Sequence, residues 1–100
     1  MIFGSDGKNM YKSGNLDMFG DGTTQAHVGN SIFSQDGVSQ RIGNSLIHTG
    51  AGISTKVGNT FSTPNGIWTR SGNMLFGPNG QVFSGVTSDD DVWSIINKET

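Results

Sequence analysis

A Gly-Asn dipeptide recurs with an almost constant period along this 100-residue chain. It occupies positions 14–15, 29–30, 43–44, 58–59 and 72–73, so the spacing alternates between 15 and 14 residues. Between these pairs falls a second series of glycine-containing turn pairs, among them Asp-Gly at 21–22 and 36–37 and Asn-Gly at 65–66. Two series of turn pairs that recur with the same period over most of the chain predict a tandem repeat.

Each repeat has the pattern strand, turn, strand, turn. Gly-Asn and Asp-Gly suit two-residue hairpin turns, because glycine takes the left-handed backbone conformation without a steric penalty. Connections this short join antiparallel neighbours. The sequence therefore predicts an all-β protein, in which tandem 14–15-residue β-hairpin repeats form a curved antiparallel meander, barrel- or propeller-like, of about eleven or twelve strands.

Counting outward from the turns predicts which residues face each other. It places Arg41 opposite Leu46 across one turn, and Ile32 opposite Arg41 across the turn before it. Ile32, Arg41 and Leu46 then share one face of the sheet, and the opposite, apolar-rich face carries Phe33, Val38, Ile42 and Ile47. We expect the apolar-rich face to be buried, either because the sheet curls on itself or because a second copy covers it.

The repeat ends near Gly85, and a different pattern follows it. Ser88 and Asp91 have the spacing of a helix capping box, and the Asp run at 89–91 suits the positive end of a helix. The sequence thus predicts a single domain with a β-hairpin repeat part (residues 1–85) and a C-terminal capping helix (86–100, helical over about 89–98). We expect this helix to cover an exposed sheet edge or mouth.

A column of basic or titratable residues stands two positions before each Gly-Asn pair. It consists of Lys12, His27, Arg41, Lys56 and Arg70, here called the basic row. The predicted pairing interleaves this row with Asp17, Ile32, Leu46, Phe61 and Leu75. One interpretation is a stripe that binds a polyanion, a nucleic acid backbone or an acidic protein face. The other is a solvated basic position that was copied with the repeat and keeps the sheet soluble.

Trp68 is expected on the same face as Arg70. An exposed indole there would stack on a sugar ring or anchor a protein partner. The alternative is that it fills the packing surface of the sheet. The candidate binding residues are therefore Lys12, His27, Arg41, Lys56, Trp68 and Arg70.

No catalytic, metal or cofactor site is expected. The chain has no cysteine, its two histidines fall in different strands, and the D-x-D-x-D-G calcium loop is absent. Neither a G-x-S-x-G motif nor a phosphate-binding glycine loop follows a strand, and the glycines are explained by turns. We expect a protein that is not an enzyme.

The start of the chain lacks the basic segment and apolar run of a secretory signal, and no stretch of 18 apolar residues is present. We expect a soluble protein without a membrane partner. It would be cytoplasmic if the chain is full length, and secreted if a signal peptide has been removed.

The segments IFGSDG, SIFSQDG, VSQRIGN and MLFGPNG resemble the tandem hairpin arrays of small Gly-Asn-rich bacterial and phage-encoded proteins of unknown function. The resemblance implies hairpin repeats and carries no activity. The expected function is a non-enzymatic protein-binding or structural β-repeat module, with a homo-oligomer as one form of it. The alternatives are a polyanion- or glycan-binding module that uses the basic row and Trp68, and a small phage-encoded inhibitor of a host factor.

Overall fold

The computed structural model describes residues 2–5, 9–35, 37–48 and 52–99. Within them the chain forms twelve short strands and one α-helix. In chain order these are β1 (Phe3–Gly4), β2 (Met10–Ser13), β3 (Leu16–Phe19), β4 (Thr24–Val28), β5 (Ser31–Ser34), β6 (Gly37–Ile42), β7 (Ser45–His48), β8 (Gly52–Val57), β9 (Thr60–Thr63), β10 (Gly66–Ser71), β11 (Met74–Phe76), β12 (Val82–Ser84) and α1 (Asp89–Glu99). The predicted all-β class and the C-terminal helix are confirmed.

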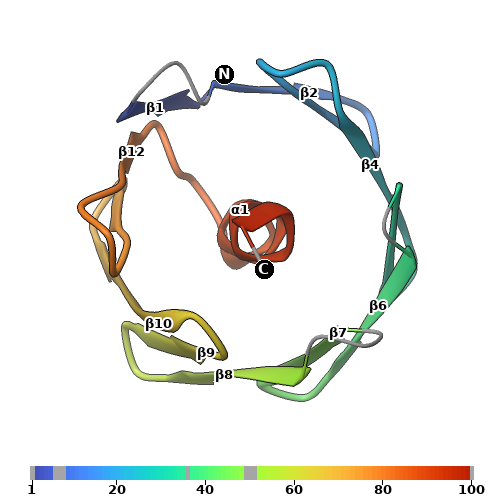
Figure 1. Ribbon diagram of the computed structural model, residues 1–100. Helices are drawn as coiled ribbons and strands as arrows, with labels where there is room; N and C mark the ends of the chain where they lie inside the picture. The colour runs from blue at the N-terminus through green and yellow to red at the C-terminus, as the bar shows by residue number, and fades with distance from the viewer. Residues whose placement is uncertain (1, 6–8, 36, 49–51, 100) are drawn as a thin grey trace.

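All strands belong to one antiparallel sheet in which β2 to β12 follow one another as hairpins (Figure 1). The sheet curves into a ring, because β1 returns to pair with β12 at the far end of the meander. Ile2, just before β1, exchanges two backbone hydrogen bonds of 2.8 and 2.9 Å with Met10 at the start of β2. The N-terminal segment therefore nearly closes a barrel and leaves little free edge.

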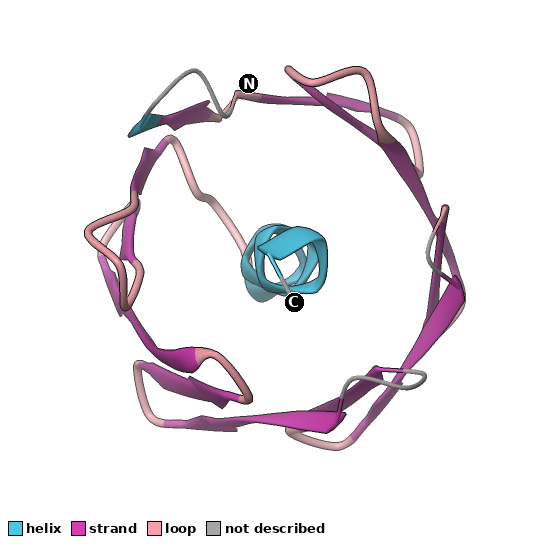
Figure 2. Cartoon of the chain, in the orientation of Figure 1, coloured by secondary structure: helices cyan, strands magenta, loops and turns pink. Residues whose placement is uncertain are grey.

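Helix α1 lies in the middle of this ring, and the linker after β12 crosses the lumen to reach it (Figure 2). Side chains alone fill a barrel of about eight strands, so a ring of twelve strands leaves central space about the width of a helix. Val92, Trp93, Ile95 and Ile96 are at most 1% exposed. The helix is therefore the core of the barrel, and the expectation that it would cover an edge or a mouth is wrong.

The predicted role of Ser88 as the N-cap of α1 is confirmed. The Asp91 amide donates a 3.4 Å hydrogen bond to Ser88 Oγ, as in a capping box. The Asp91 carboxylate does not reach back to Ser88, however. It accepts hydrogen bonds from the Thr87 amide (3.1 Å) and hydroxyl (3.0 Å) instead.

The five Gly-Asn pairs form two-residue hairpin turns, as predicted. Each turn is flanked by a directly paired couple of strand residues, for example Ile42 with Ser45. Gly43 has a φ of 59°, a value that a residue with a side chain rarely adopts. These turns lie together at one end of the barrel, which we call the Gly-Asn rim.

At the opposite end the predicted register is wrong by two residues. Ile32 pairs with Ser39 rather than Arg41, and Phe33 pairs with Val38. The reason is that Gly37 belongs to β6 and pairs with Ser34, so that the turn is centred one residue earlier than expected. Position 36 of the predicted Asp-Gly turn lies outside the described residues. A shift of two residues leaves every side chain on its predicted face.

Gly66, on the same end of the barrel, pairs with Thr63 at the start of β10 and so also lies inside a strand. A Cβ atom at this glycine would stand 2.5 Å from Cβ of Pro78, which is closer than carbon atoms approach. Glycine at this position therefore lets the proline-containing turn that follows β11 pack against β10.

The sheet curls in the direction opposite to the one expected. The apolar-rich face points outward, where Phe33 is 43% and Ile42 61% exposed, whereas Ile32 and Leu46 on the other face are almost fully buried. The inward face is still apolar enough to form a core once the helix is added. Phe61 meets Trp93 of α1 edge to face, with 5.0 Å between ring centroids.

Candidate functional site

The backbone fixes the basic row at the Gly-Asn rim. The amides of four members each donate a hydrogen bond of 2.7–2.8 Å to the carbonyl of the asparagine in the preceding Gly-Asn turn; the donors are His27, Arg41, Lys56 and Arg70. Each member therefore takes the same place in its strand, because the turn that precedes it has the same geometry. The repeat translates directly into a ring of equivalent positions.

The predicted interleaving of this row is confirmed across each Gly-Asn turn but not across the opposite turns, where Ile32 pairs with Ser39 and Leu46 with Ser54. Each member faces a residue of the neighbouring strand, and the pairs are Lys12 with Asp17, His27 with Ile32, Arg41 with Leu46, Lys56 with Phe61 and Arg70 with Leu75. All five partners are at most 1% exposed. The basic row thus lies on the lumen side of the strands.

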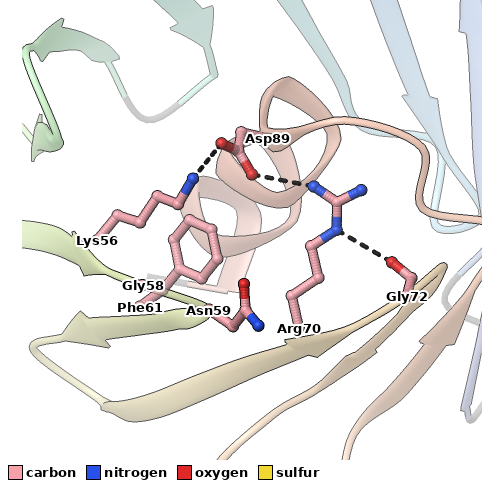
Figure 3. A pocket seen from close by; sticks show the side chains of 7 residues that line it. All are labelled: Lys56, Gly58, Asn59, Phe61, Arg70, Gly72 and Asp89. Atoms are coloured by element: carbon pink, nitrogen blue, oxygen red, sulfur yellow. Dashed lines mark hydrogen bonds and ion pairs between the residues drawn. The ribbon is translucent and has the colours of Figure 1, made fainter.

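The first turn of α1 supplies the counter-charges of the row. Lys12 Nζ lies 2.8 Å from Asp91 Oδ1, and Arg41 pairs with Asp90. Lys56 Nζ lies 2.5 Å from Asp89 Oδ2, and Arg70 Nη1 lies 3.0 Å from Asp89 Oδ1 (Figure 3). The four cations therefore bind the helix, and their charged groups stand between helix and sheet.

These contacts favour the charged forms of the helix carboxylates. The hydrogen bond from Lys56 lowers the pKa of Asp89 from its usual 3.8, against the effect of burial. Burial acts most strongly on Asp91 and raises its pKa, but the hydrogen bonds from Lys12 and Thr87 together outweigh burial and lower it. The hydrogen bond to Asp91 in turn raises the pKa of Lys12 above 10.5. Asp89, Asp91 and Lys12 are therefore in their charged forms near neutral pH.

The sequence identified these aspartates only as helix caps and missed their ion pairs with the basic row. A signal was present: the chain holds one column of cations and one run of three acids, while its formal net charge is only −2. What the sequence lacked was the placement of the helix inside the ring. That placement alone brings the acids to the row.

His27, the one titratable imidazole of the row, has a different environment. Its Nε2 lies 2.6 Å from Asp17 Oδ2 and 2.5 Å from Ser94 Oγ, and the Ser94 hydroxyl also donates to Asp17 Oδ2. Serine and aspartate thus contact the same ring nitrogen, whereas a catalytic triad places them on opposite nitrogens. Ser94 is also fully buried, so the cluster fastens α1 to β3 and β4.

Asn97, one turn further along α1, organises a second polar network. Its Nδ2 donates to Gln25 Oε1 (2.5 Å), and its Oδ1 accepts from Ser39 Oγ (2.5 Å) and lies 2.9 Å from His48 Nδ1. Burial lowers the pKa of His48 below its usual 6.5, so the imidazole is neutral at pH 7. The lumen is therefore a packed interior in which these polar side chains are paired, although Asp17 Oδ1 is a buried oxygen without a hydrogen-bond partner.

Trp68 occupies the core rather than the surface. It is 2% exposed, and its ring centroid lies 6.0 Å from that of Phe83 on β12. Gly77 packs so closely that a Cβ there would stand 2.8 Å from Trp68 Cζ3. Trp68 shares the inward face with Arg70, as expected, but its indole presents no face to solvent.

The outer face of the strands has the opposite character. Large apolar side chains between 38% and 71% exposed are spread over it; they are Phe3, Tyr11, Met18, Val28, Phe33, Ile42, Ile47, Ile53, Val57, Ile67 and Phe76. Within the described strands, every Lys, Arg and Asp is a member of the basic row or the inward-facing Asp17. The outer face consequently carries no formal charge over this part of the chain.

Comparison with protein-family models, with curated protein sequences and with solved structures finds no match to this chain. Across residues 2–5, 9–35, 37–48 and 52–99, His, Asp and Glu side chains form no group of three that could hold a metal ion. The same residues include no helix that is both long and apolar enough to cross a membrane.

Proposed function

We propose that this protein is a non-enzymatic binding module that associates with a second copy of itself through the outer face of its barrel. The observation that carries the proposal is the uncharged, apolar character of that face. Monomeric proteins rarely expose large continuous apolar areas, and those that do expose them use them for binding.

The strongest part of this face spans four neighbouring strands, β5 to β8. We call it the outer patch and define it by five exposed side chains: Phe33, Ile42, Ile47, Ile53 and Val57. Ile47 and Ile53 are direct cross-strand partners, so their side chains stand side by side. The patch crosses four strands, and an interface of standard size buries about 800 Å² on each partner.

The charge pattern favours a copy of this chain as the partner. A two-fold interface brings the same surface of two subunits together, so any charge on it meets a like charge or must be offset from it. The outer patch avoids that problem, because strands β5 to β8 direct their charged side chains inward. A strongly acidic or basic partner would find no counter-charges on the patch.

The polyanion alternative has less support. A polyanion along the whole basic row requires α1 to leave the lumen, and α1 buries Trp93, Ile95 and Ile96 almost completely. Burial of each large apolar side chain contributes about 1.5–3 kcal/mol, whereas an exposed ion pair contributes about 0–1 kcal/mol. Exchanging the helix for an outside anion is therefore unfavourable.

Sedimentation velocity over a range of protein concentrations tests self-association. We expect a mass above the 10.6 kDa of one chain, rising with concentration. The double variant Ile42→Lys/Ile53→Lys places two like charges in the outer patch and should return the protein to the monomer mass. Both side chains point to solvent (61% and 57% exposed), so the fold should survive.

Thr69→Lys/Ser71→Lys is the matched control. Thr69 and Ser71 lie on the outward face of β10, away from β5 to β8, and the double substitution adds the same two positive charges to exposed strand positions. This variant should associate as the wild-type protein does. A wild-type protein that stays monomeric at all concentrations, or an effect of the control variant equal to that of the patch variant, would contradict the proposal.

A further inference from the structure

A recess opens at the Gly-Asn rim where β8, β9 and β10 face the start of α1. Its volume is about 330 Å³, and its lining residues are Lys56, Gly58, Asn59, Phe61, Arg70, Gly72 and Asp89 (Figure 3). Two cationic side chains and an asparagine surround it, and the Phe61 ring lies below Lys56 Nζ at 5.9 Å from ring centroid to nitrogen. The recess is therefore polar and positively charged at its walls, with an aromatic floor.

The charge balance of the recess differs from that of the rest of the row. Lys12 and Arg41 each contact an aspartate of their own, whereas Lys56 and Arg70 share the single carboxylate of Asp89. Two positive groups against one negative group leave an excess of one positive charge in this quarter of the rim. An anion is the ligand that such an excess favours.

The donors of the recess are only partly used by the protein. Arg70 Nη1 binds Asp89, and Nε donates to the Gly72 carbonyl at 3.2 Å. Among the described residues, Nη2 makes no hydrogen bond, and the side-chain amide of Asn59 makes none either. A planar guanidinium with a free edge beside an ammonium group matches the oxygen atoms of a tetrahedral oxyanion.

We propose that this recess binds a tetrahedral oxyanion, a phosphate or sulfate group, between Lys56 and Arg70, with Asn59 as a further hydrogen-bond donor. The ligand needs no displacement of α1, in contrast to a polyanion on the whole row. Asp89 limits the affinity, because its carboxylate competes with the ligand for the same two cations. The recess has room for more than one anion, so the group can be free or the end of a small ester.

Titration with sodium phosphate, followed by amide chemical shifts in NMR at constant ionic strength held with sodium chloride, tests the proposal. We expect saturable shifts at the amides of the lining residues. The same titration is repeated with glycerol 3-phosphate and with sodium sulfate. Tighter binding of the ester than of phosphate identifies a terminal phosphate group as the ligand, and equal or weaker binding identifies the free ion.

Arg70→Gln and Arg41→Gln are the matched variants. Both remove an arginine at the same repeat position together with its ion pair to α1, but only Arg70 lines the recess. Arg70→Gln should weaken phosphate binding about tenfold, the effect of losing one charge-assisted hydrogen bond, whereas Arg41→Gln should leave it within about twofold.

Asp89→Asn should change the phosphate affinity in the opposite direction to Arg70→Gln. This test does not depend on the arginine variants being folded. Removal of the competing carboxylate should tighten phosphate binding several-fold, and Asp90→Asn should not. The proposal is overturned if the wild-type protein shows no saturable shifts with millimolar phosphate, if Arg41→Gln weakens binding as much as Arg70→Gln, or if Asp89→Asn weakens it.

Discussion

The inner and outer faces of the twelve strands carry opposite chemistry, although the same repeat produces both. The inner face holds the charged side chains of the described strands and joins them to α1, whereas the outer face holds exposed Ile, Val and Phe with Ser and Thr between them. In most water-soluble barrels this distribution is reversed. The difference shows that the helix changes which face of the sheet can be buried.

Two needs of the inner face explain why it is the buried one: its cations need counter-charges, and the lumen of the barrel needs to be filled. A ring of twelve strands needs a filling element, and α1 provides both an apolar side for Phe61 and carboxylates for the basic row. Once the cations are paired with the helix carboxylates inside, the mixed face becomes the core. The apolar-rich face is then left on the surface, where it is available to a partner.

The largest expected effect distinguishes the core from the outer face. Trp93→Ala should lower the free energy of unfolding by about 3–5 kcal/mol, because it opens a large cavity in the lumen. Ile67→Ala on the outer face, where the side chain is 58% exposed, should change it by less than about 0.5 kcal/mol. Urea denaturation at low protein concentration measures both, and equal losses would break the distinction between the two faces.

The second effect concerns the ion pair between Lys12 and Asp91, whose carboxylate is buried. Lys12→Met leaves the carboxylate of Asp91, which is 2% exposed, without its cation. We expect a loss of about 2 kcal/mol in the free energy of unfolding, because a buried charged acceptor then keeps only its hydrogen bonds from Thr87. The double variant Lys12→Met/Asp91→Asn should recover part of this loss. No recovery would show that the two side chains do not interact.

The third effect is a pH dependence that arises from the lumen. His48 is neutral in the folded state and has a pKa below 6.5, so below pH 6.5 the unfolded chain binds a proton that the folded protein does not. Its contribution to stability is complete above pH 6.5 and is lost as the pH falls toward the folded-state pKa, with a slope of at most about 1.4 kcal/mol per pH unit.

Thermal denaturation from pH 7.5 to 5 measures this dependence, with His48→Gln as the comparison. The variant should show a shallower decline over this range. The lowered pKa values of Asp89 and Asp91 act in a separate window, because a carboxylate with a lowered pKa loses its contribution only as the pH falls below about 4. Identical slopes for the wild type and the variant between pH 6.5 and 5 would contradict a buried, neutral His48.

The smallest effect belongs to the most exposed pair of the row. The side chain of Asp90 is 57% exposed, and that of its partner Arg41 is 35% exposed. Asp90→Asn should lower the free energy of unfolding by less than about 1 kcal/mol, and the effect should shrink further in high salt. A loss as large as that of Lys12→Met would mean that exposure does not set the strength of these pairs.

The hairpin order, the two faces and the basic row could be predicted from the sequence because they follow from local chemistry. A glycine at a two-residue turn fixes the pairing around it, as for Ile42 and Ser45, and alternation then fixes the face of each neighbour. The register near Gly37 could not be predicted, because a glycine can stand inside the turn or begin the next strand.

The direction of curling and the partners of the basic row depend on contacts between distant parts of the chain. The pairs that join Lys12 to Asp91 and Arg41 to Asp90 link residues that are 79 and 49 positions apart. No local pattern indicates that α1 enters the lumen, since an amphipathic helix of this length packs equally well on an outer surface. Trp68 illustrates the consequence: its face was predicted correctly, but its burial depends on where the helix lies.

Hydrogen exchange of the α1 amides, measured together with those of β6 and β8, tests most directly whether the helix fills the barrel. A helix enclosed by the strands can open only when the barrel opens, so the amides of Trp93 to Ile96 should exchange with the same free energy as the slowest strand amides. Exchange of these helix amides orders of magnitude faster than that of the strands would show that α1 detaches on its own, and would contradict its place in the core.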